Sequence, residues 1–173
     1  MPPSLHLATG RIKDSQQDAT EIAVLYVRMI IRPSEMQHSF LRLIFSVVLE
    51  RFPTLKFVSA EGDIAWVPHL LERADKYYRR FKEGYGVQLS LKPSEYFQRQ
   101  MYATFIDDPM GLKTYNLAGG ADHFMWSTDY PHQASTFPHT QDALEKAFQD
   151  VPLADKQKIV RDNASKLYGL PLE

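Results

Sequence analysis

The sequence contains no cysteine, no excess of charge of either sign and no long apolar run. Without cysteine, disulfides, thiolate metal sites and cysteine nucleophiles are excluded, and a cytoplasmic location is favoured. Lys and Arg number 20 against 21 Asp and Glu, so there is no electrostatic reason to expect a nucleic-acid or membrane-surface partner. The longest apolar stretch, residues 22–31, includes Arg28, whereas a membrane-spanning helix needs about 20 apolar residues.

What is present is an ordinary globular composition in a chain of single-domain length. The 173 residues are 44% hydrophobic and 24% charged, which is close to average globular usage. We therefore expect one domain over residues 1–173, since neither a disordered chain nor a coiled coil has this composition. The first residues show neither a basic segment nor a long apolar one, so no signal peptide is expected.

Short β-type runs alternate with helical segments along the chain, which is typical of βα units around a parallel sheet. Strands are expected over residues 4–7, 56–61, 101–105 and 124–127. Helices are expected over residues 34–52, 64–81, 140–149 and 155–168, with a short helix opened by residues 107–109. Residues 22–31 fit a strand or a helix, because a uniform apolar run carries no clear periodicity.

The first of these long helices has a predicted start and a predicted end. Ser34 and Gln37 have the spacing of a capping box, in which the hydroxyl accepts from a backbone amide and the Gln side chain reaches back. Pro53 is expected to end the helix. Its apolar residues lie on more than one face, which favours burial between a sheet and other helices.

Polar residues able to do chemistry follow several of the expected strands. His6, Glu61 and Asp129 each stand at or just after a strand end, and the carboxyl ends of parallel strands are where α/β folds gather catalytic groups. Imidazole and carboxylate groups also suit a borderline divalent cation such as zinc. The sequence therefore allows a catalytic or metal site, or three residues that only cap strand ends.

Two further residues are candidates for contacts with a substrate. His132 lies three residues after Asp129 and can face the same pocket or cap the following turn. Trp66 can pack in the core or stack against a substrate. Surface or capping positions are expected for the remaining histidines, His38, His69, His123 and His139.

Residues 126–132, Trp-Ser-Thr-Asp-Tyr-Pro-His, and residues 135–139, Ser-Thr-Phe-Pro-His, resemble the last barrel strand of the amidohydrolase-related family. That family includes enzymes similar to aminocarboxymuconate-semialdehyde decarboxylase. Further similarity, in the expected order, is found to the family's fifth strand, sixth βα unit and closing helix in residues 5–10, 49–58, 61–68 and 159–168. The resemblance covers nearly the whole chain.

The resemblance implies an α/β fold, a metal-dependent (β/α)8 barrel of the TIM type with a divalent metal, usually zinc, at its C-terminal face. His6 and Asp129 stand where the family has metal ligands, and Asp129 would also shuttle a proton. Glu61 stands where the family's decarboxylases have a catalytic histidine, and it would assist proton transfer or orient the substrate. His132 and Trp66 are assigned to substrate binding. The family's His-x-His ligand pair is absent from this sequence.

The chain is shorter than a complete barrel, which needs about 250 residues. We therefore expect the C-terminal half, strands 5–8, with the N-terminal half missing or supplied by another chain, and a homo-oligomer is also expected. The expected function is a metal-dependent hydrolase or carboxy-lyase acting on a small carbonyl or carboxylate substrate. The alternative is a non-catalytic half-barrel, a remnant or a subunit that completes a barrel with a partner.

Overall fold

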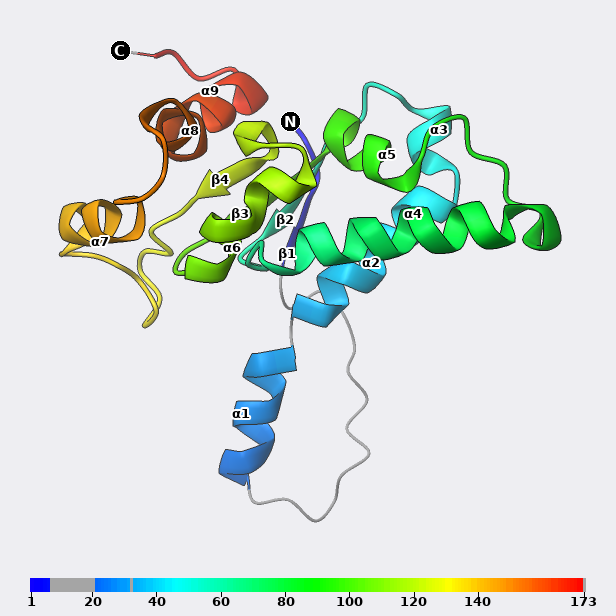
Figure 1. The fold of residues 1–173 in the computed structure, drawn as a ribbon. Coiled ribbons are helices and arrows are strands. Elements are labelled where there is room, and N and C mark those ends of the chain that lie inside the picture. The colour runs from blue at the N-terminus through cyan, green and yellow to red at the C-terminus, as the bar shows by residue number, and fades with distance from the viewer. Residues whose placement is uncertain (7–20, 32, 173) are drawn as a thin grey trace.

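The computed structural model describes residues 1–6, 21–31 and 33–172 (Figure 1). Residues 7–10, which belong to the expected first strand and its turn, lie outside these residues. The helices and strands, in chain order, are β1 (Ser4–His6), α1 (Glu21–Ile31), α2 (Pro33–Phe45), α3 (Val48–Arg51), β2 (Phe57–Ala60), α4 (Trp66–Tyr85), α5 (Pro93–Gln100), β3 (Met101–Phe105), α6 (Pro109–Thr114), η1 (Tyr115–Ala118), η2 (Ala121–His123), β4 (Phe124–Trp126), α7 (Thr140–Ala147), α8 (Leu153–Gln157), η3 (Lys158–Asp162) and α9 (Asn163–Tyr168).

Within the described residues, the strands form one parallel sheet in the order β1-β2-β3-β4. Ser59 of β2 is in register with Leu5 of β1 on one side and with Ala103 of β3 on the other. Each strand is therefore followed by helical structure and then by its parallel neighbour, as expected for βα units. The prediction of an α/β fold with a parallel sheet is confirmed.

The sheet has one face in the main core and one face in a smaller cluster. Phe57, Ala103 and Phe105 belong to the main core, together with buried residues of α2, α4 and α5. Val58 and Tyr102, which alternate with them, pack with residues of β4 and α9. The alternation of buried side chains along each strand thus places helices on both sides of the sheet.

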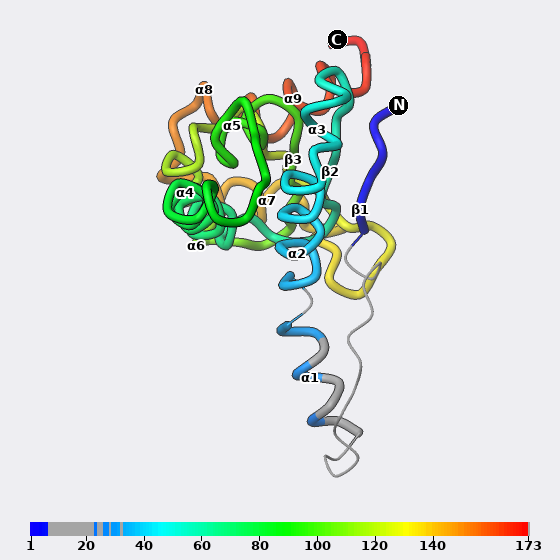
Figure 2. Tube along the Cα trace, turned by 90° about the vertical axis from the view of Figure 1, so that its right-hand side faces the viewer, coloured from blue at the N-terminus to red at the C-terminus, as the bar shows by residue number. Residues whose placement is uncertain are grey.

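Residues 22–31 lie in a helix, α1, which projects away from the sheet in two perpendicular views (Figures 1 and 2). The expected capping box at Ser34 is wrong, because α2 begins at Pro33 and Ser34 lies inside its first turn. Proline is well suited to the first helical turn, where its missing N–H leaves no hydrogen bond unmade. The helix expected over residues 34–52 is interrupted after Phe45, where Val47 has φ 58°.

Helix α5 has no counterpart among the expected elements. It begins with Pro93, and the Glu95 carboxylate accepts a hydrogen bond from the Lys92 backbone N–H at 2.6 Å. Proline at the first position and glutamate at the third are signals for a helix start, although Lys92 is not a usual N-cap.

Among the described helices, none is long and apolar enough to pass through a bilayer.

Candidate metal centre at the carboxyl ends of the strands

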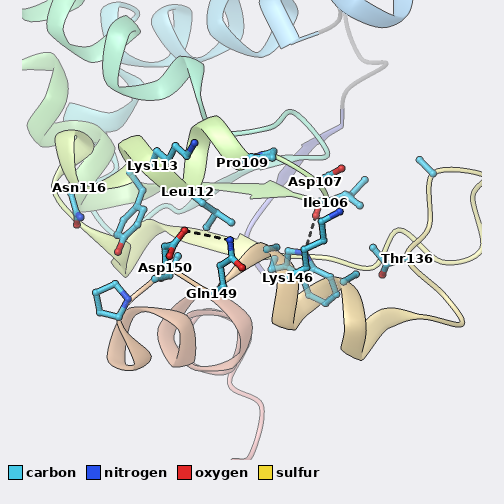
Figure 3. A pocket seen from close by; sticks show the side chains of 17 residues that line it. Ile106, Asp107, Pro109, Leu112, Lys113, Asn116, Thr136, Lys146, Gln149 and Asp150 are labelled. Carbon is cyan, nitrogen blue, oxygen red and sulfur yellow. Dashed lines mark hydrogen bonds between the residues drawn. The ribbon is translucent and has the colours of Figure 1, made fainter.

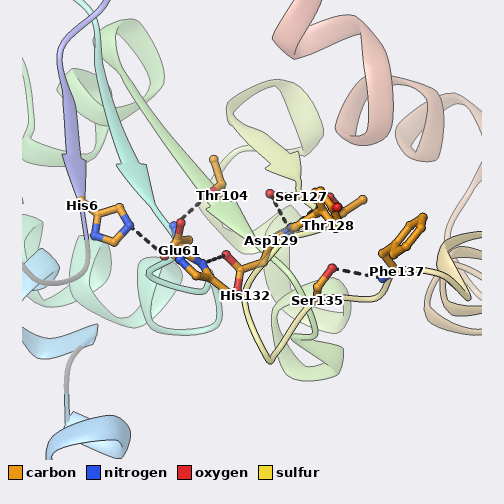
Figure 4. Close-up of polar contacts among 10 residues, drawn as sticks. His6, Glu61, Thr104, Ser127, Thr128, Asp129, His132, Ser135 and Phe137 are labelled. Carbon is orange, nitrogen blue, oxygen red and sulfur yellow. Dashed lines mark hydrogen bonds and ion pairs between the residues drawn. The ribbon is translucent and has the colours of Figure 1, made fainter.

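The side chains that follow β1 and β2 meet at one edge of the sheet (Figure 4). His6 ends β1, and its Nε2 lies 2.9 Å from Oε2 of Glu61, which follows β2. The Glu61 side chain is 25% exposed and the His6 side chain 50% exposed, so the pair lies at the mouth of the site. Parallel strands in register bring these two ends together, as the sequence indicated.

The loop after β4 supplies a second acid–imidazole pair. Nδ1 of His132 lies 2.7 Å from Oδ1 of Asp129, whose side chain is only 8% exposed. The hydrogen bond from His132 and the negative charge of Asp129 raise the pKa of His132 above its ordinary value. The His132 side chain is 64% exposed, so its imidazole borders the open side of the site.

The two pairs form one cluster. Ligand atoms of Glu61, Asp129 and His132 all lie within 4.8 Å of one another, a spacing at which they could hold one metal ion. Two carboxylates and one imidazole are donors that suit zinc and manganese alike. His6 reaches this cluster through its contact with Glu61. The structure therefore brings His6, Glu61, Asp129 and His132 together, and the role of each stays a prediction.

The backbone at Glu61 is held in an uncommon conformation. Glu61 has φ 59°, and its N–H donates to Oγ1 of Thr104 on β3 at 2.8 Å. The backbone just after Glu61 is held by Trp66, whose indole N–H donates a hydrogen bond to the Gly62 carbonyl at 2.6 Å. Trp66 also packs edge-on against Phe40, with ring centroids 5.4 Å apart. Its contacts are those of a packing anchor, and its assignment to substrate binding stays a prediction.

Asp108 links the loop after β2 to the helix after β3. Its Oδ2 accepts from the N–H groups of Ile64 and Ala65 at 2.7 and 2.8 Å, and its Oδ1 accepts from Gly111 N–H at 2.8 Å. A Cβ at position 111 would lie 2.5 Å from Asp108 Oδ2, so glycine allows this close approach. Neither Thr104 nor Asp108 was singled out from the sequence as a residue that supports the site.

A third acid, Asp63, lies in the same loop. Burial, followed by the charges of Asp108 and Asp107, raises the pKa of Asp63 to about 6. Like Glu61 and Asp129, Asp63 has a positive φ, in its case 54°. The loop between β2 and α4 thus contains one acid that points into the cluster and one whose charge is disfavoured by its surroundings.

A separate cavity of about 660 Å³ lies between α6 and α7 (Figure 3). Its lining includes Trp126, whose indole N–H donates to the Ile106 carbonyl at 2.8 Å. None of the four clustered residues contributes to this lining. The cavity and the acid–imidazole cluster are therefore different places in the molecule.

Comparison with protein families finds a match to the amidohydrolase model over residues 5–170. A search of curated proteins finds no match. Several solved structures are similar to this chain. The 5-carboxyvanillate decarboxylase from Sphingomonas paucimobilis is 26% identical, with a TM-score of 0.67 over 81% of this chain and 41% of its own.

Two further structures are also named as decarboxylases. A dihydroxybenzoic acid decarboxylase from a Polaromonas species, solved with bound manganese and 2-nitroresorcinol, is 23% identical, with a TM-score of 0.69 over 99% of this chain and 51% of its own. The 2,6-dihydroxybenzoate decarboxylase from Rhizobium is 22% identical, with a TM-score of 0.70 over 97% and 51%. This chain therefore spans about half the length of each of these similar structures.

Proposed function

Because this chain belongs to the amidohydrolase family, we propose that it is the C-terminal half of a metal-dependent (β/α)8 barrel, a hydrolase or carboxy-lyase of small carbonyl or carboxylate substrates. One observation carries this proposal: two carboxylates and two imidazoles converge at one edge of a parallel sheet. That edge is formed by the carboxyl ends of the strands, where barrel enzymes place their catalytic groups.

The half-barrel part of the proposal rests on length and topology. A complete barrel needs about 250 residues, and the parallel strands here fit strands 5–8 of such a barrel. Similar structures are covered over only 41–51% of their length. We propose that residues 1–173 form one domain, and that the remaining strands and a His-x-His pair come from another segment or a partner chain.

A divalent cation fits the donors that are present. Glu61, Asp129 and His132 offer two oxygens and one nitrogen within 4.8 Å of one another, and His6 adjoins them. Zinc accepts this donor set, as expected from the sequence, and the manganese in the Polaromonas structure supports manganese equally. When bound, such a cation supplies Lewis-acid polarisation of a substrate oxygen.

Separate roles in metal binding and proton transfer are proposed for the residues of the cluster. Asp129 is the proposed ligand and proton acceptor, because its carboxylate is nearly buried and already holds the His132 imidazole. His6 is a proposed ligand, and Glu61 is proposed to bind the cation or to move a proton. These proposed roles are supported by the closeness of the ligand atoms of Glu61 and Asp129, which lie within 4.8 Å of each other and of His132.

Two residues are proposed to bind the substrate. Where Glu61, Asp129 and His6 hold the cation, the exposed ring of His132 is free of that role and can donate a hydrogen bond to the carboxylate of an incoming acid. Trp66 adjoins the loop that contains Glu61 and can border the substrate pocket in the complete barrel. The decarboxylases among the similar structures act on aromatic acids by name, which supports a carboxy-lyase of such acids over a hydrolase. A cytoplasmic location is part of the same proposal.

Metal titration of the purified chain tests the centre. Manganese and zinc are expected to bind, and Asp129→Asn should weaken binding about 10-fold or more, because it removes a charged ligand from a set of few. His69→Gln is the matched control, since His69 is an exposed imidazole on α4 outside the cluster. Equal affinities for wild type and Asp129→Asn would refute the assignment.

A carbon dioxide assay tests the reaction. The chain is combined with an N-terminal half that contains a His-x-His pair and is given 2,6-dihydroxybenzoate or 5-carboxyvanillate. Release of carbon dioxide is expected, and Asp129→Asn should lower the rate at least about 100-fold, as is typical when a general acid or base is lost. The alternative, a non-catalytic half-barrel, is favoured by the missing His-x-His pair. It predicts metal binding with no turnover of either acid.

A further inference from the structure

The described side chains of helix α1 are apolar and exposed, and none of them is among the residues of the two core clusters. Its exposed side chains include Tyr26, Val27, Met29, Ile30 and Ile31, at 44–77% of their area. The helix stands away from the sheet in both views (Figures 1 and 2). Contiguous apolar surface of this kind is uncommon on a monomer and marks an interaction site.

The C-terminal part of α4 carries an aromatic groove, formed by Phe45, Tyr77, Tyr78, Phe81 and Tyr85. Three of these rings follow one another along the helix, with centroids 6.0 Å apart from Tyr77 to Phe81 and 5.8 Å apart from Phe81 to Tyr85. The groove has a volume of about 390 Å³. Its three consecutive rings are 39–77% exposed, so the groove is open to a partner.

We propose that α1 of a second copy of this chain lies in the aromatic groove, and that the contact is reciprocal. The eleven residues of α1 extend over about 16 Å, and the rings from Tyr77 to Tyr85 extend over about 12 Å of helix, so the two surfaces match in length. An apolar helix in an apolar groove is a common mode of recognition. A two-fold axis then relates two equivalent contacts, which together cover the α1 helices and the aromatic grooves of both protomers.

The apolar area is sufficient for a stable dimer. Five side chains of α1 and three of the groove are each roughly half exposed, and a large side chain offers about 200 Å² when fully exposed. Together they can bury on the order of 800 Å² per protomer, which is about what each partner contributes to an interface of standard size. The dimer therefore needs no further contact to account for its stability.

Sedimentation of the purified 173-residue chain at several concentrations tests the dimer. A dimer is expected, and Ile30→Glu in α1 and Phe81→Glu in the groove should each raise its dissociation constant about 30-fold or more, as for an interface hot spot. Leu117→Glu is the control, because Leu117 is 78% exposed on η1, outside both surfaces. Circular dichroism verifies folding, and Ile30→Ser and Phe81→Ser replace any variant that unfolds.

The same measurement can overturn the proposal. A chain that stays monomeric overturns it, and so does a dimer that Ile30→Glu weakens while Phe81→Glu does not. Crosslinking identifies the occupant of the groove, since the sequence has no cysteine to interfere. A mixture of Ile30→Cys and Phe81→Cys chains should form a disulfide between the two variants. Faster self-crosslinking of Ile30→Cys would place α1 against α1, and an intramolecular disulfide in the double variant would place it in its own groove; either result refutes the exchange.

Discussion

At the scale of single residues, Asp108 helps to hold in place the loop that contains Glu61 and Asp63. It is 8% exposed and accepts three backbone hydrogen bonds, two from the loop between β2 and α4 and one from the first turn of α6. The loop contains Glu61 and Asp63, and Asp108 itself is the N-cap of α6. A buried carboxylate with three N–H donors thus fixes the loop and the start of the helix relative to each other.

Replacing Asp108 is therefore expected to cost stability. Asp108→Ala leaves Ile64, Ala65 and Gly111 N–H groups without their acceptor, which should lower the free energy of unfolding by about 2–4 kcal/mol. Asp107→Ala removes an exposed neighbour and should change it by less than about 0.5 kcal/mol. Urea unfolding of both variants measures the difference, and equal losses would contradict this role for Asp108.

Asp63 makes the unfolding free energy depend on pH. Its folded pKa is about 6 and its ordinary value 3.8, so the folded chain binds the proton more tightly. Stability is then lost as pH rises from about 4 to about 6, since deprotonation favours the unfolded chain. Asp63→Asn should remove this loss and stabilise the metal-free chain at pH 7 by about 1–2 kcal/mol, after allowance for partial exposure.

Asparagine tolerates the positive φ of position 63, so Asp63→Asn removes the charge without adding backbone strain. Unfolding by urea in the presence of a chelator, at pH 4 and pH 7, compares wild type with Asp63→Asn. The increase in the free energy of unfolding of Asp63→Asn over wild type should be present at pH 7 and nearly absent at pH 4. Glu83→Gln, an exposed acid on α4, should show the same small effect at both pH values. A gain of equal size at both pH values would show that charge is not its cause.

At the scale of elements, one polar side chain adds hydrogen bonds to the apolar packing between the closing helix and the last strand. Asn163, at the start of α9, donates to the carbonyls of Ala121 and Phe124 at 2.7 and 2.8 Å and is 6% exposed. These carbonyls belong to η2 and β4, so the Asn163 amide joins α9 to both elements. The attachment of α9 therefore depends on a polar residue within an otherwise apolar contact.

Asn163→Ala is expected to lower the free energy of unfolding by about 2–3 kcal/mol, because two buried carbonyls lose their donors. Lys166→Ala, at an exposed position three residues further along α9, should change it by less than about 0.5 kcal/mol. Thermal and urea unfolding distinguish the two variants. If Asn163→Ala were as stable as Lys166→Ala, α9 would be held by its apolar contacts alone.

The elements that sequence patterns predict are those with strong local signals. The strand at 101–105 agrees with β3 at both ends, and the helix that begins near residue 64 is recognised from charged pairs at i, i+4 spacing. Helix α5 is missed because its start uses Lys92 and a proline instead of a usual cap. The break at Val47 has no local signal, since a positive φ is unusual for a β-branched residue and no glycine or asparagine lies within residues 44–50.

In the candidate site, too, some residues can be found from the sequence and others cannot. His6, Glu61 and Asp129 can be found from the sequence, because a parallel sheet brings the residues after its strands to one edge. Thr104 and Asp108 cannot, because their hydrogen bonds join residues that are 43 to 44 positions apart in the sequence. Such contacts arise only when neighbouring βα units pack together.

At the scale of the whole molecule, the open sheet and the proposed metal centre are both incomplete in the same way under the half-barrel proposal. The described strands form an open sheet with β1 at one edge and β4 at the other. In the proposed barrel, both edges and the centre would be completed by the N-terminal half. Stability and metal affinity should then increase together when that half is supplied.

Reconstitution tests this coupling. Addition of an N-terminal half with a His-x-His pair should tighten binding of manganese or zinc about 100-fold or more, because affinity rises steeply as ligands complete the coordination. The control half has both histidines replaced by alanine and should restore the sheet edges without restoring the affinity. Competition against a chelating dye measures both. Equal affinity with either half would show that the N-terminal histidines are not ligands.

The backbone at Glu61 and Asp129 restricts which substitutions the chain can accept. Both acids have a φ near +60°, a conformation that costs most L-residues about 1–2 kcal/mol and is most unfavourable for β-branched side chains. In a saturation library selected only for folding, valine, isoleucine and threonine should therefore be depleted at both positions, while glycine and asparagine persist. The chain's capacity to evolve a different centre is thus limited by backbone geometry before any chemistry is selected.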